Sequence, residues 1–136
     1  MELELIARKD RRIAKAIAEV LRDLTVRPTR VEVAHAASLA PTYFSKRFRR
    51  IVGKSYTRWN MCMRIDFACE LLTMTDRRVQ QIARAVGYED VTTFERAFRK
   101  VTGMCPTECR ALRRAQTTPN AEGNTQNAET RAKAVK

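Results

Sequence analysis

The chain has 136 residues, enough for one ordinary domain or for two very small domains that share an interface. Lysine and arginine outnumber aspartate and glutamate by 27 to 15, which gives a formal net charge of +12. This surplus favours a polyanionic partner, but by itself it does not separate DNA, RNA and an acidic membrane surface. The apolar runs are too short to span a bilayer and the acidic start is not typical of a signal peptide, so we expect a soluble, cytoplasmic protein.

An amphipathic helix is predicted over residues 10–24, where large aliphatic side chains recur at the helical period. Pro28 interrupts this pattern, and Thr29-x-x-Glu32 has the spacing of a capping box that opens a second helix. A short turn at residues 38–41 leads to a third helix, apolar on one face and basic on the other. Two short helices joined by such a turn predict a helix-turn-helix.

The longest predicted helix covers residues 55–73 and carries two apolar stripes, so we expect it to be buried on two sides and to connect two small bundles. A short amphipathic helix follows and ends at Gly87, where a left-handed cap is expected. A second basic helix then runs through Lys100, and a last helix covers residues 105–114.

Two stretches fifty residues apart, 43–53 and 93–103, repeat one pattern. Two phenylalanines, an arginine and a glycine recur in register: Phe44, Phe48, Arg49 and Gly53 return as Phe94, Phe98, Arg99 and Gly103. The phenylalanines have the spacing of core residues, not of base-stacking platforms. An internal repeat of this kind predicts a duplicated helix-turn-helix.

These patterns together predict an all-α, seven-helix bilobed domain, in which two helix-turn-helix units are joined by a long linker helix. The predicted boundaries are an N-terminal extension at 1–9, a first unit at 10–54, a linker helix at 55–75, a second unit at 76–114 and a tail at 115–136. The tail has no aromatic residue and one large aliphatic residue, so we expect it to be disordered.

Several motifs occur in order along residues 10–114: Arg64-Ile65-x-x-Ala68-x-x-Leu71-Leu72, then Ile82-Ala83-x-x-Val86-Gly87-Tyr88, then Phe94-x-x-x-Phe98 with Gly103 and Pro106. This arrangement resembles the DNA-binding domain of the AraC/XylS family. In length the chain is similar to the small stand-alone superoxide and multidrug response regulators, or else it is a fragment of a larger regulator. Four positions depart from the family pattern. Family members usually have glycine where Ser38 stands, and serine or threonine where Cys105 stands. They usually have an aromatic residue at the position of Cys109 and leucine at the position of Arg30.

The resemblance implies a sequence-specific transcription regulator, most often an activator that contacts RNA polymerase. It also implies that each recognition helix enters the major groove on one face of double-stranded DNA. We expect the chain to bind as a monomer at the nucleoid, with its two recognition helices in successive major-groove segments about 34 Å apart.

The resemblance also assigns roles to outward-facing residues of both recognition helices. Base contacts are expected from Thr42, Ser45 and Lys46 of the first helix and from Val91, Thr92, Glu95 and Arg96 of the second. Phosphate contacts are expected from Arg49, Arg50, Lys54, Arg99 and Lys100. Arg96 can bind guanine through two hydrogen bonds, and Glu95 can accept one from cytosine N4. Glu95 also stands four residues before Arg99, so a helical ion pair is the alternative for this residue.

The four cysteines show no Cys-x-x-Cys spacing, and His35 is the only histidine. Cys62 and Cys69 fall about 10 Å apart on one predicted helix, too far for a disulfide. We therefore expect reduced thiols, no cofactor and no metal site. Cys105 at a predicted helix start, with Cys109 one turn later, leaves a redox or metal-sensing pair as an alternative to ordinary packing.

Three functions from other classes stay as alternatives. The nearest is an architectural nucleic-acid binder with little sequence preference. An enzyme is disfavoured by the single histidine and the lack of a separate catalytic domain. A membrane-contact module is disfavoured because the apolar stripes pair into repeats and do not form one exposed face.

Overall fold

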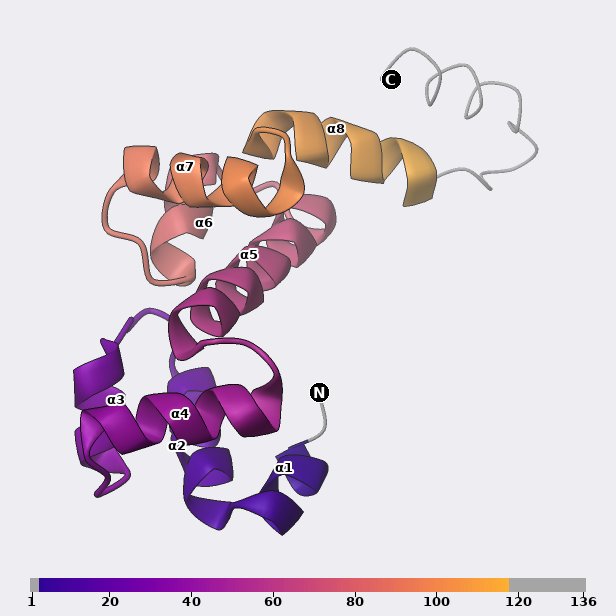
Figure 1. Cartoon of the computed structure of the whole chain (residues 1–136). Helices are drawn as coiled ribbons and strands as arrows, with labels where there is room; N and C mark the ends of the chain where they lie inside the picture. The colour runs from indigo at the N-terminus through magenta and orange to yellow at the C-terminus, as the bar shows by residue number, and fades with distance from the viewer. Residues whose placement is uncertain (1–2, 118–136) are drawn as a thin grey trace. The chain divides into compact units, whose positions relative to one another are not determined.

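The computed structural model describes residues 3–117, and all regular structure in that range is α-helical (Figure 1). The eight helices are α1 (Leu3–Lys9), α2 (Arg11–Arg22), α3 (Arg30–Ala36), α4 (Pro41–Val52), α5 (Tyr56–Met74), α6 (Val79–Ala85), α7 (Val91–Thr102) and α8 (Pro106–Thr117). The predicted all-α fold is confirmed. One helix more than the seven predicted is present, because the segment treated as an N-terminal extension forms α1.

Helix α8 runs to Thr117, beyond its predicted end near Arg114. Residues 115–117 of the predicted tail therefore belong to a helix, and residues 118–136 lie outside the described residues.

The described chain divides into two compact units. The first comprises residues 3–64 and 85–88, and the second comprises residues 65–84 and 89–117. The division falls inside α5, between Arg64 and Ile65. Helix α5 is therefore shared between the units and contributes its first half to one core and its second half to the other.

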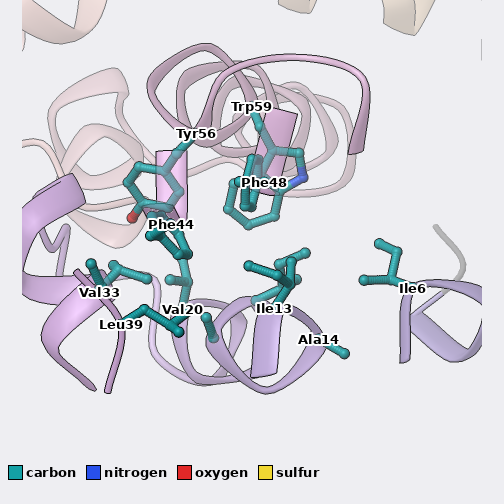
Figure 2. Packing of buried hydrophobic residues seen from close by; sticks show 13 residues of the cluster. Ile6, Ile13, Ala14, Val20, Val33, Leu39, Phe44, Phe48, Tyr56 and Trp59 are labelled. Atoms are coloured by element: carbon teal, nitrogen blue, oxygen red, sulfur yellow. The ribbon is translucent and has the colours of Figure 1, made fainter. Parts of the chain in front are cut away.

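Aromatic side chains of α4 and α5 form the centre of the core of the first unit (Figure 2). Phe44 and Phe48 are completely buried, and the Phe48 ring centroid lies 5.6 Å from those of both Tyr56 and Trp59. Aliphatic side chains of α2 and α3 complete the cluster, among them Ile13, Ile17, Val20, Val33 and Ala34. These phenylalanines are core residues, as their helical spacing predicts.

Helix α3 begins with the predicted capping box. Thr29 Oγ1 accepts a hydrogen bond from the backbone N–H of Glu32 at 3.2 Å, and the Glu32 carboxylate accepts one from the backbone N–H of Thr29 at 2.8 Å. Both N–H groups lie in the first turn, where a helix has no internal acceptors. The cap places the start of α3 one residue after Thr29.

The turn between α3 and α4 contains Ser38 with φ of +61°, the only non-glycine residue with positive φ in the described range. A side chain in this left-handed region costs roughly 1–2 kcal/mol, because its Cβ crowds the following carbonyl oxygen. Serine at this position, in place of the glycine usual in the family, therefore lowers the stability of the first helix-turn-helix.

The buried guanidinium of Arg64 connects α5 to two loops of the first unit. Its Nε donates to Asn60 Oδ1 at 2.9 Å, and its Nη1 donates to the carbonyls of Leu24 at 2.6 Å and Val86 at 2.9 Å. Its Nη2 donates to the carbonyl of Val26 at 2.9 Å. Arg64 is 0% exposed, and burial lowers its pKa, yet an arginine stays charged in proteins. Oxygen dipoles take the place of water around this charge.

Gly87 lies directly against Arg64. Its φ is +93°, and a Cβ at this position would stand 2.5 Å from Arg64 Nη1 and 2.6 Å from the carbonyl oxygen of Leu24. Gly53, in the same unit, has φ of +96°, but a Cβ there would have no atom within 4 Å. Gly87 is thus required both for its conformation and for its lack of a side chain.

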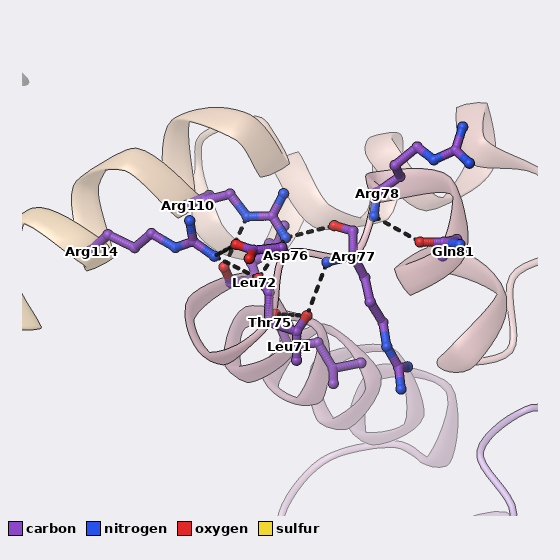
Figure 3. Close-up of polar contacts among 9 residues, drawn as sticks. All are labelled: Leu71, Leu72, Thr75, Asp76, Arg77, Arg78, Gln81, Arg110 and Arg114. Carbon is purple, nitrogen blue, oxygen red and sulfur yellow. Dashed lines mark hydrogen bonds and ion pairs between the residues drawn. The ribbon is translucent and has the colours of Figure 1, made fainter.

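In the second unit, two arginines of α8 donate hydrogen bonds to carbonyls at the C-terminal end of α5 (Figure 3). Arg110 donates to the carbonyls of Leu72 at 2.9 Å, Thr75 at 3.1 Å and Arg77 at 2.7 Å. Arg114 donates to the Thr75 carbonyl at 2.6 Å and to Asp76 at 3.0 Å. The last carbonyls of a helix lack internal donors, so these cations satisfy them and complement the negative end of the helix dipole.

The prediction that both apolar stripes of α5 are buried is confirmed only in part, because Met61, Met63 and Leu71 are half-buried and Phe67 is exposed. Ile65, Ala68 and Leu72 are completely buried, but Phe67, in the other stripe, is 41% exposed. An apolar stripe read from the sequence does not show how far the neighbouring elements extend over it.

We expect Ser38→Gly to raise the unfolding free energy by about 0.5–1 kcal/mol, because it removes the left-handed penalty and adds only the backbone entropy of glycine. Urea denaturation of the purified protein measures this change. Ala37→Gly is the matched control, because Ala37 has φ of −90° and glycine there relieves no left-handed strain. Destabilisation by Ser38→Gly would contradict the account.

Gly87→Ala should destabilise the protein by roughly 1–3 kcal/mol more than Gly53→Ala in the same assay, because only at Gly87 must Arg64 or the Leu24 carbonyl be displaced. Both variants carry the left-handed strain of alanine, so the difference isolates the steric conflict. Equal losses in the two variants would show that the space beside Arg64 is not restrictive.

Candidate nucleic-acid interface

The core contacts of α4 determine which of its side chains face outward. Pro41 occupies the first helical position, and Gly53, with φ of +96°, ends the helix by donating its N–H to the Arg49 carbonyl at 2.9 Å. Phe44 and Phe48 are buried one turn apart on the inner face. The outer face therefore carries exposed side chains at most of the predicted DNA-contacting positions, namely Thr42, Lys46, Arg49 and Arg50, with Lys54 exposed just beyond the helix.

A groove of about 740 Å³ lies along the outer side of α4. It is lined by Tyr43, Lys46, Arg47, Arg49 and Arg50, so all of its charged lining residues are cationic. The structure thus brings together one predicted base contact and two predicted phosphate contacts. Tyr43 is 45% exposed, and the guanidinium of Arg12 lies 5.9 Å from its ring centroid.

Ser45 differs from the other predicted base contacts because it already has a protein partner. It is half-buried, and Arg30 Nη1 donates to its hydroxyl oxygen at 3.0 Å. The same nitrogen donates to the Pro41 carbonyl at 3.3 Å. In the sequence Arg30 stands out only as a departure from a usual leucine, and its contact with Ser45 could not be predicted.

Helix α7 repeats the frame of α4 with a stronger N-terminal cap. The Asp90 carboxylate accepts hydrogen bonds from the backbone N–H of Thr93 at 3.0 Å and from its hydroxyl at 2.7 Å, and these bonds lower the pKa of Asp90. Gly103, with φ of +83°, ends the helix, and Phe94 and Phe98 are buried with ring centroids 5.7 Å apart. The N-cap of α4 is Ala40, which makes no such side-chain bond.

The predicted contacts of α7 lie outside its buried face. Val91 is half-buried, and Thr92, Glu95, Arg96, Arg99 and Lys100 are exposed. Within residues 3–117, Glu95 forms no ion pair with Arg99, so the helical ion pair is absent and the carboxylate is exposed to solvent.

Comparison with known proteins gives a family match that includes both α4 and α7. A family model described as a helix-turn-helix domain matches residues 33–112. The arabinose operon regulatory protein of Escherichia coli (strain K12) is 38% identical over 79 residues, which are 58% of this chain and 27% of that protein. The chain belongs to the AraC-type helix-turn-helix family of DNA-binding transcription regulators.

Further relatives and solved structures agree with this assignment. The MmsAB operon regulatory protein of Pseudomonas aeruginosa is 33% identical over 57% of this chain and 25% of its own length. The DNA-binding domain of AdpA, solved in complex with a target DNA, superposes with a TM-score of 0.73 at 26% identity, covering 82% of this chain and 97% of that domain. The C-terminal domain of AraT from Geobacillus stearothermophilus gives a TM-score of 0.70 at 27% identity, covering 73% and 83%.

The matched segment spans only about a quarter of the curated relatives, 25% and 27% of the two proteins named. The two relatives are operon regulatory proteins, and the AdpA structure is the DNA-binding domain of a global transcriptional factor. Among residues 3–117, no helix is long and apolar enough to cross a membrane.

An ion pair that was not predicted anchors α4 of this AraC-type domain to the start of α2. Arg47 Nε donates to Asp10 Oδ2 at 2.8 Å, and Arg47 Nη2 donates to the Lys9 carbonyl at 3.3 Å. Asp10 is also the N-cap of α2, since its carboxylate accepts from the backbone N–H of Arg12 at 2.9 Å. Asp10 directly before an apolar periodic run is the sequence signal that could have identified this cap.

Asp10 is held ionised by its partners. Its burial by itself raises the pKa, but the hydrogen bonds from Arg47 and from the backbone N–H groups of Arg12 and Ile13 outweigh burial and hold the pKa below its usual value. The carboxylate therefore stabilises the folded state as long as it is charged.

Cys105 and Cys109 do not form the pair that was considered as an alternative to ordinary packing. All four thiols are free, and Cys109 lies against Cys69, with 3.9 Å between the two sulfur atoms, whereas Cys105 contacts Thr107 Oγ1 at 3.3 Å. Burial raises the pKa of Cys69 to about 12, which leaves little thiolate at neutral pH. His35 is exposed, and the described part of the chain contains no group of three or more potential metal ligands.

We expect Asp10→Asn to lower the unfolding free energy at pH 7 by about 1.5–3 kcal/mol, because asparagine keeps the N-cap but loses the charged hydrogen bond to Arg47. A carboxylate with a lowered folded pKa contributes its full stability above its unfolded pKa of roughly 4 and loses it as pH falls through the folded pKa. Denaturation curves between pH 7 and pH 2 should therefore converge for the wild type and Asp10→Asn at the acidic end. A constant difference across this range would contradict the ion-pair account.

Proposed function

We propose that this chain is a sequence-specific transcription regulator that places α4 and α7 in successive major-groove segments of double-stranded DNA. The observation that supports the proposal is the repeated frame with different outer residues. Each helix buries two phenylalanines one turn apart and leaves a basic face exposed. Among the proposed base-facing positions Thr42 and Thr92 are the same, but Ser45 and Lys46 are replaced by Glu95 and Arg96 in the second copy. Two different outer faces on one frame suit the reading of two different half-sites.

The proposed roles follow the exposed faces. Base edges would be contacted by Thr42, Ser45 and Lys46 of α4 and by Val91, Thr92, Glu95 and Arg96 of α7. Five basic residues would contact phosphates and supply the salt-dependent part of the affinity: Arg49, Arg50, Lys54, Arg99 and Lys100. Because Glu95 forms no ion pair with Arg99 in the described chain, its carboxylate is available to accept from cytosine N4.

We further propose that the chain binds as a monomer in the cytoplasm and activates transcription by contacting RNA polymerase. The internal repeat supports monomeric binding, because one chain supplies both recognition helices. The names of the relatives, operon regulatory proteins, support a role at promoters. Transcription in vitro with purified polymerase, with and without the protein, tests the sign of regulation, and a fall in transcript would overturn the activator proposal.

In vitro selection of bound duplexes from a random pool tests the binding mode. We expect a bipartite site whose two half-sites are centred about one helical turn, roughly 34 Å, apart. A single short box would mean that one helix alone reads bases. Equal affinity for selected and random duplexes at physiological salt would instead identify an architectural binder.

Arg96→Ala should weaken binding to the selected site by about 1–3 kcal/mol and relax the preference at one base pair. Lys100→Ala is the matched comparison from the same helix, because loss of a phosphate contact should weaken binding to all sequences alike and reduce the salt slope by about one. Titrations of both variants at several salt concentrations distinguish the two roles. If Arg96→Ala behaves like Lys100→Ala, Arg96 contacts phosphate and not a base.

A further inference from the structure

Arg30 lies on α3, outside both recognition helices, yet its guanidinium contacts the first turns of α4. Its Nη1 donates to Ser45 Oγ at 3.0 Å and to the Pro41 carbonyl at 3.3 Å. Thr42 and Ser45, the first two base-facing positions of α4, belong to this part of the helix. Arg30 itself is exposed, and within residues 3–117 it forms no ion pair.

This contact determines what the Ser45 hydroxyl can offer to DNA. A serine hydroxyl has one O–H donor and two acceptor lone pairs. In a helix that hydroxyl often donates back to the carbonyl four residues earlier, which for Ser45 is Pro41. Arg30 donates to both oxygens, so it occupies a lone pair of Ser45 and competes for the Pro41 carbonyl. This arrangement favours a Ser45 O–H that points away from the helix and can donate.

We propose that Arg30 is a positioning residue for DNA sequence recognition, which fixes Ser45 as a hydrogen-bond donor to a base; the inference rests on the proposed function. Guanine O6 and N7, adenine N7 and thymine O4 accept a proton in the major groove, whereas the N4 amino group of cytosine donates one. Ser45 held as a donor therefore disfavours cytosine at the base it faces. The guanidinium itself adds a positive charge beside that contact.

A double-mutant cycle on base preference tests this role. The base pair read by Ser45 is identified first, as the position at which Ser45→Ala changes the preference of the wild type. Affinities are then measured for four duplexes that differ only at this base pair, with the wild type, Arg30→Met, Ser45→Ala and the double variant. Methionine keeps the unbranched stem and helix propensity of arginine without its donors.

We expect Arg30→Met to reduce the preference for the best base over cytosine roughly threefold to tenfold, as expected for one hydrogen bond. Ser45→Ala should cause a similar loss, and the double variant should lose no more than either single variant. Arg30→Lys serves as a second variant, because it keeps the charge but lacks the planar fork of donors. It should keep the salt slope of the wild type and lose part of the preference.

Arg58→Met is the matched control for loss of one charge. Arg58 is exposed on α5 in the same unit, and its removal should leave base preference unchanged. If Arg30→Met keeps the wild-type preference, or if the two single losses multiply in the double variant, the positioning role is wrong and the proposed function stands. If the wild type itself selects no sequence, the proposed function fails and this inference fails with it.

Discussion

The buried guanidinium of Arg64 is the interaction on which most of the first unit depends. It donates to the carbonyls of Leu24, Val26 and Val86 and to the side chain of Asn60, so one charged group fixes two loops against α5. Its acceptors are neutral oxygens, and removal of the arginine would leave three carbonyls without their donor. Buried polar groups that lose a partner cost about 1–3 kcal/mol each.

The two recognition helices share a frame and differ in how they are held. Helix α7 has a carboxylate cap from Asp90, whereas α4 begins without a side-chain cap and is held instead by Arg30 at its first turns and by Arg47 through Asp10. Helix α4 is therefore held by residues distant from it in the sequence, whereas the start of α7 is stabilised by its neighbour Asp90. The duplication is visible in the buried phenylalanines and in the left-handed glycines, and the supporting contacts have diverged.

The sequence was sufficient to predict the elements that depend on local chemistry. Apolar periodicity predicts the helices from α2 onward, the capping box at Thr29 and Glu32 predicts the start of α3, and the spacing of Phe44 and Phe94 predicts the shared frame. The outward faces of α4 and α7 follow from that frame, so the candidate interface could be located without coordinates. The specific base and phosphate roles stay predictions.

Contacts between residues far apart in the sequence could not be predicted in the same way. Arg64 is part of a motif that carries the family resemblance, but its burial could not be predicted, because its acceptors come from loops 40 and 22 positions away. In the sequence Arg47 resembles Arg49 and Arg50 of α4, for which phosphate contacts are proposed, and its contact with Asp10 separates it from them. The pairing of Cys109 with Cys69 depends on how α8 lies against α5, which no spacing along the chain encodes.

The segment 85–88 belongs to the second helix-turn-helix by its place in the repeat, but it is part of the first compact unit through Arg64 and Gly87. Cooperative folding follows packing and not repeat boundaries. We therefore expect the amide protons of this turn to exchange when the core around Phe48 opens, and those of α7 to exchange when the core of the second unit opens. A cut between the repeats, at residues 75 and 76, would divide both cores. Residues 85–88 of the first unit would be left in the second fragment, and residues 65–75 of the second unit would be left in the first.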